Sequence, residues 1–384
     1  MTQTITPHGT CDPAFGAVRD AFVNNFTEHH EIGASVCIEI DGRRVVDLWG
    51  GVAVPSGSRE WSADELVNAF SVGKGITAIV AAQCVSRGEL SYDTVVSTVW
   101  PDFAVHGKDS ITFRDLLGHR GGLPAVRHEL AADAMLTWDT MTSALANETP
   151  WWTPGTAHGY HVNTFGFLVG EVIRRATGRT VGQLLRERIS EPMGADIFLG
   201  SCSHLSSRIA EFEWPVGATA PIERAGLTDE QLMQRNTYAN PPGLSGSGYV
   251  NSSEWRDAEM PSTNTHASAR GIAALYTVMA HGGAYNGHDL VATSVLTDAT
   301  TEVSLGDDQV LGRVSRFGHG FQLPIPERGF GPNVAAFGHY GAGGSVGFSD
   351  PVAKVGFGYV MNQMGPRWQN PRNRALIDSF YSCL

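Results

Sequence analysis

The sequence predicts an α/β (α+β) fold, with a sheet domain assembled from both ends of the chain and a mostly helical domain between them. Strand-like patterns lie near both termini, at residues 35–49 and 353–362. Apolar residues at helical spacing dominate from about 110 to 195. With 384 residues, the chain is long enough for two cooperating domains.

The first elements follow from local spacing. An amphipathic helix is predicted over residues 15–29, where apolar side chains recur every three or four residues at Phe15, Val18, Phe22 and Phe26. The strand-like segments SVCIEI and RVVDLW then flank Asp41-Gly42. An Asp-Gly pair between two such segments predicts a β-hairpin with a tight turn.

The segment LVNAFSVGKGITAIVAAQCVS, residues 66–86, is apolar over almost its whole length, and Lys74 is its only charged residue. It is too long for a single strand, so it predicts a buried helix that begins near Ser71.

The later elements have recognisable ends. FRDLLGHRGGLP ends one helix in a glycine-rich loop, and FGFLVGEVIRRATG predicts another with Gly178 as its C-cap. Residues 201–262 are rich in Ser, Gly and Pro and predict long loops. ARGIAALYTVMAHGG predicts a helix, AKVGFGYVMN a strand after the Asp350-Pro351 turn, and RNRALIDSFY a terminal helix. We therefore expect a sheet domain of residues 1–65 and 200–384 and a helical domain of residues 66–199.

Composition excludes several classes of function. Lys and Arg number 27 against 39 Asp and Glu, which gives a formal net charge of −12. Nucleic-acid binding is not expected, because it needs a basic surface. The glycine-rich stretches lack the Walker lysine and the Rossmann spacing, and His29-His30-Glu31 lacks the spacing of a zinc protease, so no cofactor and no metal are expected.

The cysteines and the apolar runs bear on location. Five scattered cysteines without CxxC spacing predict neither a disulfide framework nor a zinc site. The start, MTQTITPHGTCDP, lacks the features of a signal peptide, and no apolar run approaches the roughly 18 residues of a membrane span. A cytoplasmic protein that does not enter the membrane is expected, and its oligomeric state is not predicted.

Ser71 and Lys74 are the first candidate catalytic residues. Side chains three residues apart on a helix lie on the same face. An apolar environment disfavours the ammonium form, so the pKa of Lys74 should be lowered from roughly 10.4. Such a lysine can accept a proton from a serine. The alternative is that Ser71 only caps the helix while Lys74 extends to water.

Two further segments favour a catalytic role for Ser71 and Lys74 over a purely structural one. In WWTPGTAHGYH a Pro-Gly turn brings Tyr160 to the start of the next predicted helix. In FGHYGAGGSVGFSDP, residues 337–351, closely spaced glycines would let a ligand approach a strand edge, where a backbone N–H could bind an oxyanion.

Taken in order, S-x-x-K, a tyrosine after a Pro-Gly turn and an H-x-G strand resemble the serine β-lactamase and penicillin-binding-protein superfamily. The chain is most similar to the esterase branch, the class-C-β-lactamase-like family VIII carboxylesterases. DLLGHRGGLP is similar to that family's DLLTHTSGLP, and the resemblance covers roughly residues 30–362. It implies an antiparallel sheet flanked by helices, with the site in the cleft between the two domains.

The resemblance also implies roles. Ser71 would be the acyl-accepting nucleophile, and Lys74 and Tyr160 would share the general acid–base work. The N–H groups of Ser71 and Ala342 would form the oxyanion hole. Further third-motif and substrate-binding positions would be His339, Gly341 and Gly343. Apart from the resemblance, we expect Asn264 and His266 to lie in a loop that either borders the acyl pocket or is only held together by its polar residues.

The chain departs from the family pattern at two places. His339 stands where β-lactamases and D-alanyl peptidases usually have lysine; since histidine is mostly neutral at pH 7, this favours neutral esters over β-lactams. Asparagine is expected two residues after Tyr160, but Val162 is there and Asn163 follows. Either the turn holds an extra residue or Asn163 faces away from the site. A further alternative is that His161 points inward in place of Asn163.

These residues leave several hypotheses. The first is a serine carboxylesterase that acts on small to medium neutral esters, a small-molecule substrate, through a Ser71 acyl-enzyme. The alternatives are a β-lactamase, a D-amino-acid peptidase or amidase, an acyltransferase, or a penicillin-binding module that is acylated without turnover. A rival nucleophile is Ser345 in G-x-S-x-G, which would need a helix directly after it.

Overall fold

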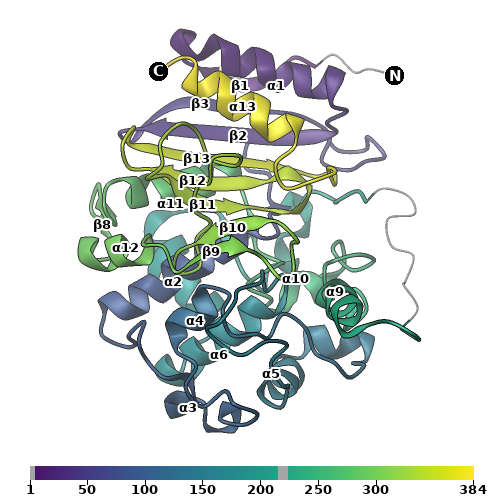
Figure 1. The fold of residues 1–384 in the computed structure, drawn as a ribbon. Helices are drawn as coiled ribbons and strands as arrows, with labels where there is room; N and C mark the ends of the chain where they lie inside the picture. Colours follow the sequence, from purple (N-terminus) through teal and green to yellow (C-terminus); the bar gives the residue numbers. More distant parts are fainter. Residues whose placement is uncertain (1–4, 215–223) are drawn as a thin grey trace.

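The computed structural model describes residues 5–214 and 224–384. Its centre is an antiparallel sheet of six strands in the order β1-β3-β2-β13-β12-β11. Three strands come from the start of the chain and three from its end, as Figure 1 shows by their purple and yellow-green colours. The bounds are β1 His8–Cys11, β2 Gly33–Ile40, β3 Arg43–Gly51, β11 Phe337–Tyr340, β12 Val346–Asp350 and β13 Val355–Met361. The predicted α/β fold is confirmed.

The hairpin of β2 and β3 turns at Asp41 and Gly42, as predicted. Both residues have positive φ, 49° and 72°. That conformation matches the right-handed twist of the flanking strands, and Asp-Gly tolerates it well. A side chain at Gly42 would also place its Cβ 2.4 Å from the hydroxyl of Tyr285.

Helices cover both faces of the sheet. Helices α1 (Gly16–Glu28) and α13 (Pro371–Tyr381) pack together on one face, and α11 (Ala269–Ala280) covers the other. The rings of Phe15 and Phe380 stack at 5.6 Å between α1 and the end of α13. Close approach of α11 depends on a glycine: a Cβ at Gly356 in β13 would lie 2.3 Å from the carbonyl oxygen of Ala273.

The helical part lies below the sheet in Figure 1. Helix α2 separates the two, because it packs against α6 and α7 on one side and against β11 on the other. Nearly every residue of α2 is buried, as expected of a helix that is apolar on all sides. The helices are α2 Val72–Ser86, α3 Val96–Val99, α4 Phe113–Leu117, α5 Trp138–Ala146, α6 Thr164–Thr177, α7 Val181–Leu185 and α8 Glu191–Met193.

The region predicted as loops, residues 201–262, contains two α-helices and a 3-10 helix (Ser203–Arg208) among its described residues, so that prediction is wrong in part. Helix α9 (Asp229–Ala239) begins with a capping box between Thr228 and Gln231. Few of its residues are buried, so it has no apolar stripe that the sequence could reveal. Helix α10 (Ser253–Asp257) is only five residues long. Residues 215–223 of the predicted loops lie outside the described residues.

The remaining elements are short. Strands β9 and β10 form a separate antiparallel pair that lies in front of β11 in Figure 1. Strand β6 pairs with β4 and β5, and β7 pairs with β8. The bounds of these strands are β4 Val67–Asn68, β5 Ile197–Phe198, β6 His266–Ala267, β7 Ala284–Tyr285, β8 His288–Asp289, β9 Ser304–Asp307 and β10 Val314–Phe317. Helix α12 (Thr293–Ala299) lies between β8 and β9 in the sequence.

Residues 229–264 lie against the helical part. The side-chain amide of Asn236 donates to the carbonyl of Val126 at 2.8 Å, and that of Asn163 donates to the carbonyl of Thr237 at 2.9 Å. The division into residues 1–65 with 200–384 and residues 66–199 stays a prediction.

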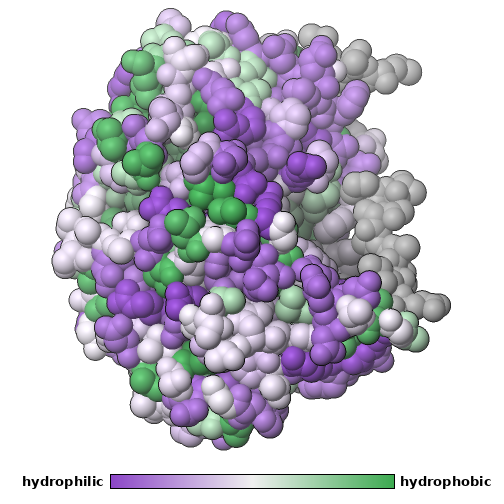
Figure 2. Space-filling model, viewed as in Figure 1, coloured by the Kyte–Doolittle hydropathy of each residue, from purple (hydrophilic) through white to green (hydrophobic). Residues whose placement is uncertain are grey.

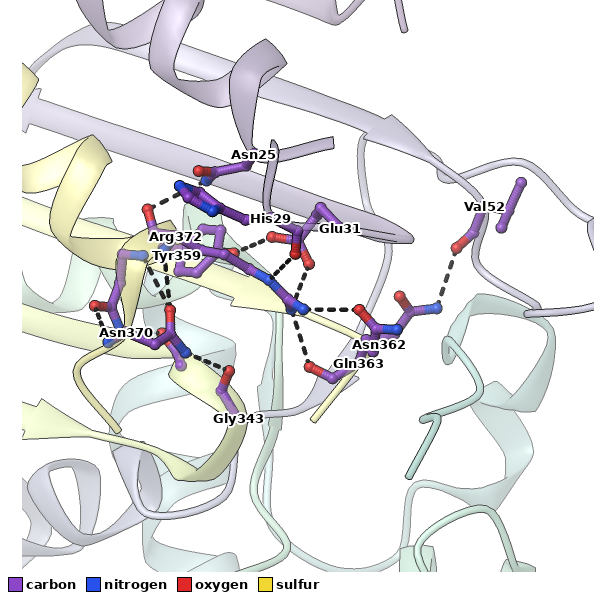
Figure 3. Close-up of polar contacts among 12 residues, drawn as sticks. Asn25, His29, Glu31, Val52, Gly343, Tyr359, Asn362, Gln363, Asn370 and Arg372 are labelled. Carbon is purple, nitrogen blue, oxygen red and sulfur yellow. Dashed lines mark hydrogen bonds and ion pairs between the residues drawn. The ribbon is translucent and has the colours of Figure 1, made fainter. Parts of the chain in front are cut away.

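A buried polar network fixes α13 against the sheet (Figure 3). Arg372 pairs with Glu31 at 3.0 Å, and the same carboxylate accepts the hydroxyl proton of Tyr359 in β13. Two asparagines at the start of α13 hold the loop that follows β11. Asn370, the N-cap residue, donates to the carbonyl of Gly343 at 2.9 Å. Asn373, in the first turn of the helix, donates to the carbonyl of Gly344 at 2.8 Å. The network therefore sets the position of this loop.

The face seen in Figure 2 is largely hydrophilic or intermediate in character, and its hydrophobic residues form small separate groups. Larger apolar side chains lie mostly in the core, with exceptions such as Leu305, which is 54% exposed on β9. Among the described residues, no helix has both the length and the apolar character needed to cross a bilayer.

The packing of α11 on β13 gives a stability prediction. We expect Gly356→Ala to lower the free energy of unfolding by about 3 kcal/mol, because the new methyl group meets backbone atoms that cannot move aside. Chemical denaturation measures the change. Gly16→Ala is the matched control, since nothing lies within 4 Å of a Cβ there; a loss at Gly356 no larger than at Gly16 would contradict the packing argument.

Candidate active site

Ser71 lies at the N-terminus of α2, as predicted, and its side chain is 7% exposed. The preceding residue, Phe70, has a positive φ of 48°, a conformation that costs about 1–3 kcal/mol for a non-glycine residue. Packing holds it in place: its ring meets that of Phe212 edge-on at 4.9 Å and also contacts Trp214. The nucleophile position therefore follows a strained turn that the core supports.

Lys74 is completely buried, and its amine lies among three oxygen atoms. Its Nζ is 3.2 Å from Ser71 Oγ, 2.6 Å from the carbonyl oxygen of Val162 and 3.1 Å from that of Ser262. Burial holds the pKa of Lys74 well below its ordinary value of 10.5. Lys74 does not extend to water, so the alternative of a surface lysine is excluded.

Tyr160 is also fully buried, with its ring among other aromatic rings. It lies parallel to Phe317 at 5.8 Å and contacts Trp368 at 4.8 Å. The Nζ of Lys74 is 4.8 Å from its ring centroid. Burial raises the pKa of Tyr160 well above its ordinary value, and the nearby Ser71 hydroxyl acts in the opposite direction. The Tyr160 hydroxyl makes no hydrogen bond among the described residues. The structure thus brings Ser71, Lys74 and Tyr160 together.

The turn around Tyr160 is held by buried histidines. His161 Nε2 accepts the N–H of Leu123 at 2.9 Å, so its Nδ1 carries the proton and donates to the carbonyl of Gly159 at 2.6 Å. Burial lowers the pKa of His161 to about 4, which keeps the ring neutral. The backbone N–H of His161 donates to His119 Nδ1 at 3.1 Å. His161 is therefore a structural residue and does not face the site.

Asn163 turns away from Lys74. Its side-chain amide donates to the carbonyl of Thr237 and to the hydroxyl of Ser245, and its oxygen accepts from Thr263. Of the two readings left open by the sequence, the one in which Asn163 does not face the site is correct. The carbonyl of Val162 contacts the lysine instead.

The third motif begins with His339 in β11, a fully buried residue. Its Nδ1 lies 2.7 Å from the carbonyl oxygen of Tyr340, which can only accept, so Nδ1 donates. Burial and the nearby Lys74 lower the pKa of His339 well below its ordinary value. The ring is therefore neutral, and its Nε2 presents a lone pair.

Gly341 brings the loop after β11 against the start of α2. A Cβ at this position would lie 2.4 Å from the carbonyl oxygen of Ala69 and 2.2 Å from Ser345 Oγ. Ala342 and Gly343 follow in a short 3-10 segment, and Gly343 has a positive φ of 82°. Among the described residues, the backbone N–H groups of Ser71 and Ala342 donate to no acceptor.

Asn264 and His266 direct no hydrogen bond toward Ser71, Lys74 or Tyr160 among the described residues. Asn264 uses its side chain within its own loop: it donates to the carbonyls of Trp255 and Ala258 and accepts the N–H of Met260. His266 lies in β6, fully buried, with a pKa lowered by burial to about 3. Neither residue lines the pocket beside Ala342.

The rival nucleophile Ser345 is excluded by its surroundings. It is fully buried, its hydroxyl donates to the carbonyl of Ala69 at 2.8 Å, and β12 begins at the next residue. A nucleophile elbow needs an exposed serine and a following helix. Ser345 instead fastens the third motif to the turn before Ser71.

Sequence reasoning missed part of the site. The carbonyl groups of Val162 and Ser262 contact Lys74, but backbone groups leave no mark in a sequence pattern. Asp308 accepts the backbone N–H of Tyr160 at 2.9 Å and so positions the turn that holds the tyrosine. It comes from the loop between β9 and β10, 148 residues further along the chain, and no local signal marks it.

A pocket of about 390 Å³ opens beside the third motif. Ala342, Gly343, Met364, Tyr238 and Trp368 are among the residues that line it. An adjoining pocket has a volume of about 280 Å³, and Trp368 lines both pockets.

Comparison with known proteins places this geometry in a family. The family model described as Beta-lactamase matches residues 18–381. The chain belongs to the β-lactamase family. Within this family, the esterase/β-lactamase LipL of Mycobacterium tuberculosis is 31% identical over 369 residues, which cover 93% of this chain and 83% of LipL.

Two solved structures of the same fold are also similar. A family VIII carboxylesterase superposes with a TM-score of 0.91 at 37% identity, covering 99% of this chain and 100% of that one. A penicillin-binding protein homologue from Caulobacter crescentus gives a TM-score of 0.91 at 36% identity, with the same coverage. The resemblance to the β-lactamase superfamily, with its esterase branch, is thereby confirmed.

The buried lysine predicts a pH dependence of stability. Because the pKa of Lys74 is lower in the folded chain than in the unfolded chain, the unfolded state binds more protons between the two values. The free energy of unfolding of the wild type, relative to Lys74→Met, should therefore rise between pH 8 and 10, by up to about 1.4 kcal/mol per pH unit.

Chemical denaturation of both proteins at several pH values tests this. Lys354→Met, which removes a lysine at the surface, is the matched control and should not reproduce the slope. A difference between wild type and Lys74→Met that does not change with pH would contradict the lowered pKa.

Proposed function

We propose that the chain is a serine carboxylesterase that hydrolyses small to medium carboxylic esters through an acyl-enzyme on Ser71. The observation that carries the proposal is the position of the Lys74 amine, 3.2 Å from Ser71 Oγ and enclosed by two carbonyl groups. The names of the relatives, a family VIII carboxylesterase and an esterase/β-lactamase, support the same reaction.

The surroundings of Lys74 suit a general base. A neutral amine has two N–H donors and one lone pair. The carbonyls of Val162 and Ser262 take both donors, so the lone pair faces the Ser71 hydroxyl. Because the pKa of Lys74 is lowered, this neutral form is accessible at lower pH than for a lysine in water.

The reaction then has two halves. Ser71 Oγ bonds to the ester carbonyl carbon while its proton passes to Lys74. Collapse of the tetrahedral intermediate breaks the bond to the alcohol oxygen, which takes up the proton and leaves. A water molecule next attacks the acyl-enzyme, gives up a proton to the same base, and releases the carboxylic acid with Ser71 restored.

Tyr160 acts as the proton donor to the leaving alcohol. Its raised pKa keeps the phenol protonated at neutral pH. Lys74 lies over its ring and both residues neighbour Ser71, so the proton taken up by the lysine can be returned through the tyrosine. Asp308 and the stacked ring of Phe317 keep the tyrosine in place.

The N–H groups of Ser71 and Ala342 form the proposed oxyanion hole. Gly341 allows the two segments to approach each other, since any side chain there would collide with Ala69. Asn370 and Asn373 hold the loop after β11 through the carbonyls of Gly343 and Gly344. Donors that are fixed before the reaction stabilise the developing charge without rearrangement.

Hydrolysis of a β-lactam or D-amino-acid amide, or transfer of the acyl group to an alcohol, would use the same acyl-enzyme. His339 favours esters, because a neutral ring with a lone pair at Nε2 offers no cation to a β-lactam carboxylate. An acylated module without turnover would stop after the first half of the reaction.

A reducing compartment, with the cytoplasm as the expected location, is part of the proposal. All five cysteines are free thiols, of which three are buried. Proteins from oxidising compartments more often pair their cysteines.

The roles of the three side chains can be tested by substitution. Ser71→Ala should abolish hydrolysis of 4-nitrophenyl acetate and butyrate, since no acyl-enzyme can form. Lys74→Ala and Tyr160→Phe should each lower kcat by about 10²–10⁴, the usual contribution of general acid–base catalysis. Circular dichroism and thermal unfolding check that the variants remain folded.

Ser345→Ala is the matched control for Ser71→Ala. It removes a hydroxyl that bonds to the backbone next to the site but is not the proposed nucleophile. Activity that survives in Ser71→Ala and disappears in Ser345→Ala would refute the assignment. A chromogenic cephalosporin in parallel distinguishes ester from β-lactam turnover.

A further inference from the structure

Two arginines line the pocket beside the proposed oxyanion hole. Arg313 lies just before β10, and Arg367 lies in the segment between β13 and α13. Both line the 390 Å³ pocket together with Ala342 and Gly343, and both also line the adjoining pocket. Both arginines therefore border the space beside Ala342, although Ser71 itself lines neither pocket.

The position of Arg313 is defined by packing. Its guanidinium carbon lies 5.2 Å from the ring centroid of Trp368, so the aromatic face orients it. Burial lowers the pKa of Arg313, and the positive charges of Arg328 and Arg367 lower it further while Asp308 opposes them. Three guanidinium groups thus lie close enough to repel one another.

Arg313 and Arg367 have no ion-pair partner among residues 5–214 and 224–384, although most arginines of this acidic chain do. Asp308, whose charge acts on Arg313, accepts hydrogen bonds from other donors: the N–H groups of Tyr160, Val310 and Leu311, and the hydroxyl of Ser315. Glu327 lines only the adjoining pocket, where it lies beside Arg328.

His339 cannot supply the missing contact for an anion. Its Nδ1 donates to the carbonyl of Tyr340, so it presents a lone pair at Nε2, which repels a carboxylate. An anionic group on a substrate would therefore be bound by the two arginines rather than by the third motif. Guanidinium groups suit this contact because their N–H donors match the two oxygens of a carboxylate.

We propose that Arg313 and Arg367 form a carboxylate-binding subsite, so that the preferred substrates are esters that also carry a carboxylate group. The inference rests on the proposed esterase function and deepens it. It modifies the expectation drawn from His339: His339 itself offers no cation, so neutral esters remain substrates, but an ester with a carboxylate within reach of the two arginines is a better substrate.

Matched pairs of substrates test this subsite. On the acyl side, mono-4-nitrophenyl glutarate is compared with 4-nitrophenyl glutaramate, which replaces the carboxylate by an amide of the same shape. On the alcohol side, 4-carboxyphenyl butyrate is compared with 4-carbamoylphenyl butyrate. We expect kcat/KM to favour the carboxylate at least tenfold in one pair, which shows on which side of the ester the subsite lies.

The variants Arg313→Gln and Arg367→Gln should each lower that preference several-fold, mainly through KM, and leave kcat/KM for the amide partner almost unchanged. Arg19→Gln, which removes an exposed arginine of α1 that pairs with Asp20, is the matched control and should keep the wild-type preference. Sodium chloride at 0.5 M should reduce the preference, because salt screens the attraction between charges.

Two results would overturn the inference while ester hydrolysis itself stands. One is equal turnover of the carboxylate and amide substrates in both pairs. The other is a preference for the carboxylate that survives in the double variant Arg313→Gln/Arg367→Gln. Failure of the wild type to hydrolyse any of the four esters in a Ser71-dependent manner would instead overturn the proposed function, and the subsite with it.

Discussion

The burial of the Lys74 amine is the constraint on which the rest of the site depends. Three oxygen atoms surround Nζ, from Ser71, Val162 and Ser262, and burial lowers the pKa of the amine. An ammonium ion in this position would lack the solvation that water provides, and the two carbonyls compensate only in part. In the proposed mechanism, the same environment makes Lys74 a base next to Ser71.

The neighbouring elements fix the three oxygen atoms from different parts of the chain. Ser71 is set by the strained turn at Phe70, which Ser345 holds from the third motif. Val162 belongs to the turn that buried histidines stabilise, and Ser262 binds α6 through the N–H of Gly166. Helix α2 lies between the sheet and the helical part, so any relative movement of the two would disturb this arrangement.

The sequence predicted those features that depend on local pattern. The hairpin turn at Asp41, the buried helix α2 and the proximity of Ser71 to Lys74 all follow from spacing within a few residues. Helix α9 escaped prediction because it buries few side chains. The carbonyl contacts of Lys74 and the support from Asp308 join residues 88 to 188 positions apart, and only the folded chain brings them together. Asn264 was expected either to border the acyl pocket or to hold its own loop together, and its side-chain hydrogen bonds are all made within its loop.

The most direct measurement is the pKa of Lys74 in the folded protein. The chain has only three lysines, Lys74, Lys108 and Lys354, so a protein labelled with ¹³Cε-lysine gives few NMR signals, and Lys74→Met assigns the one of interest. The account predicts that this signal titrates far below 10.5 and that the acid limb of the kcat profile follows it. A Lys74 that stays protonated up to about pH 10 while the enzyme is active at pH 7 would contradict the account.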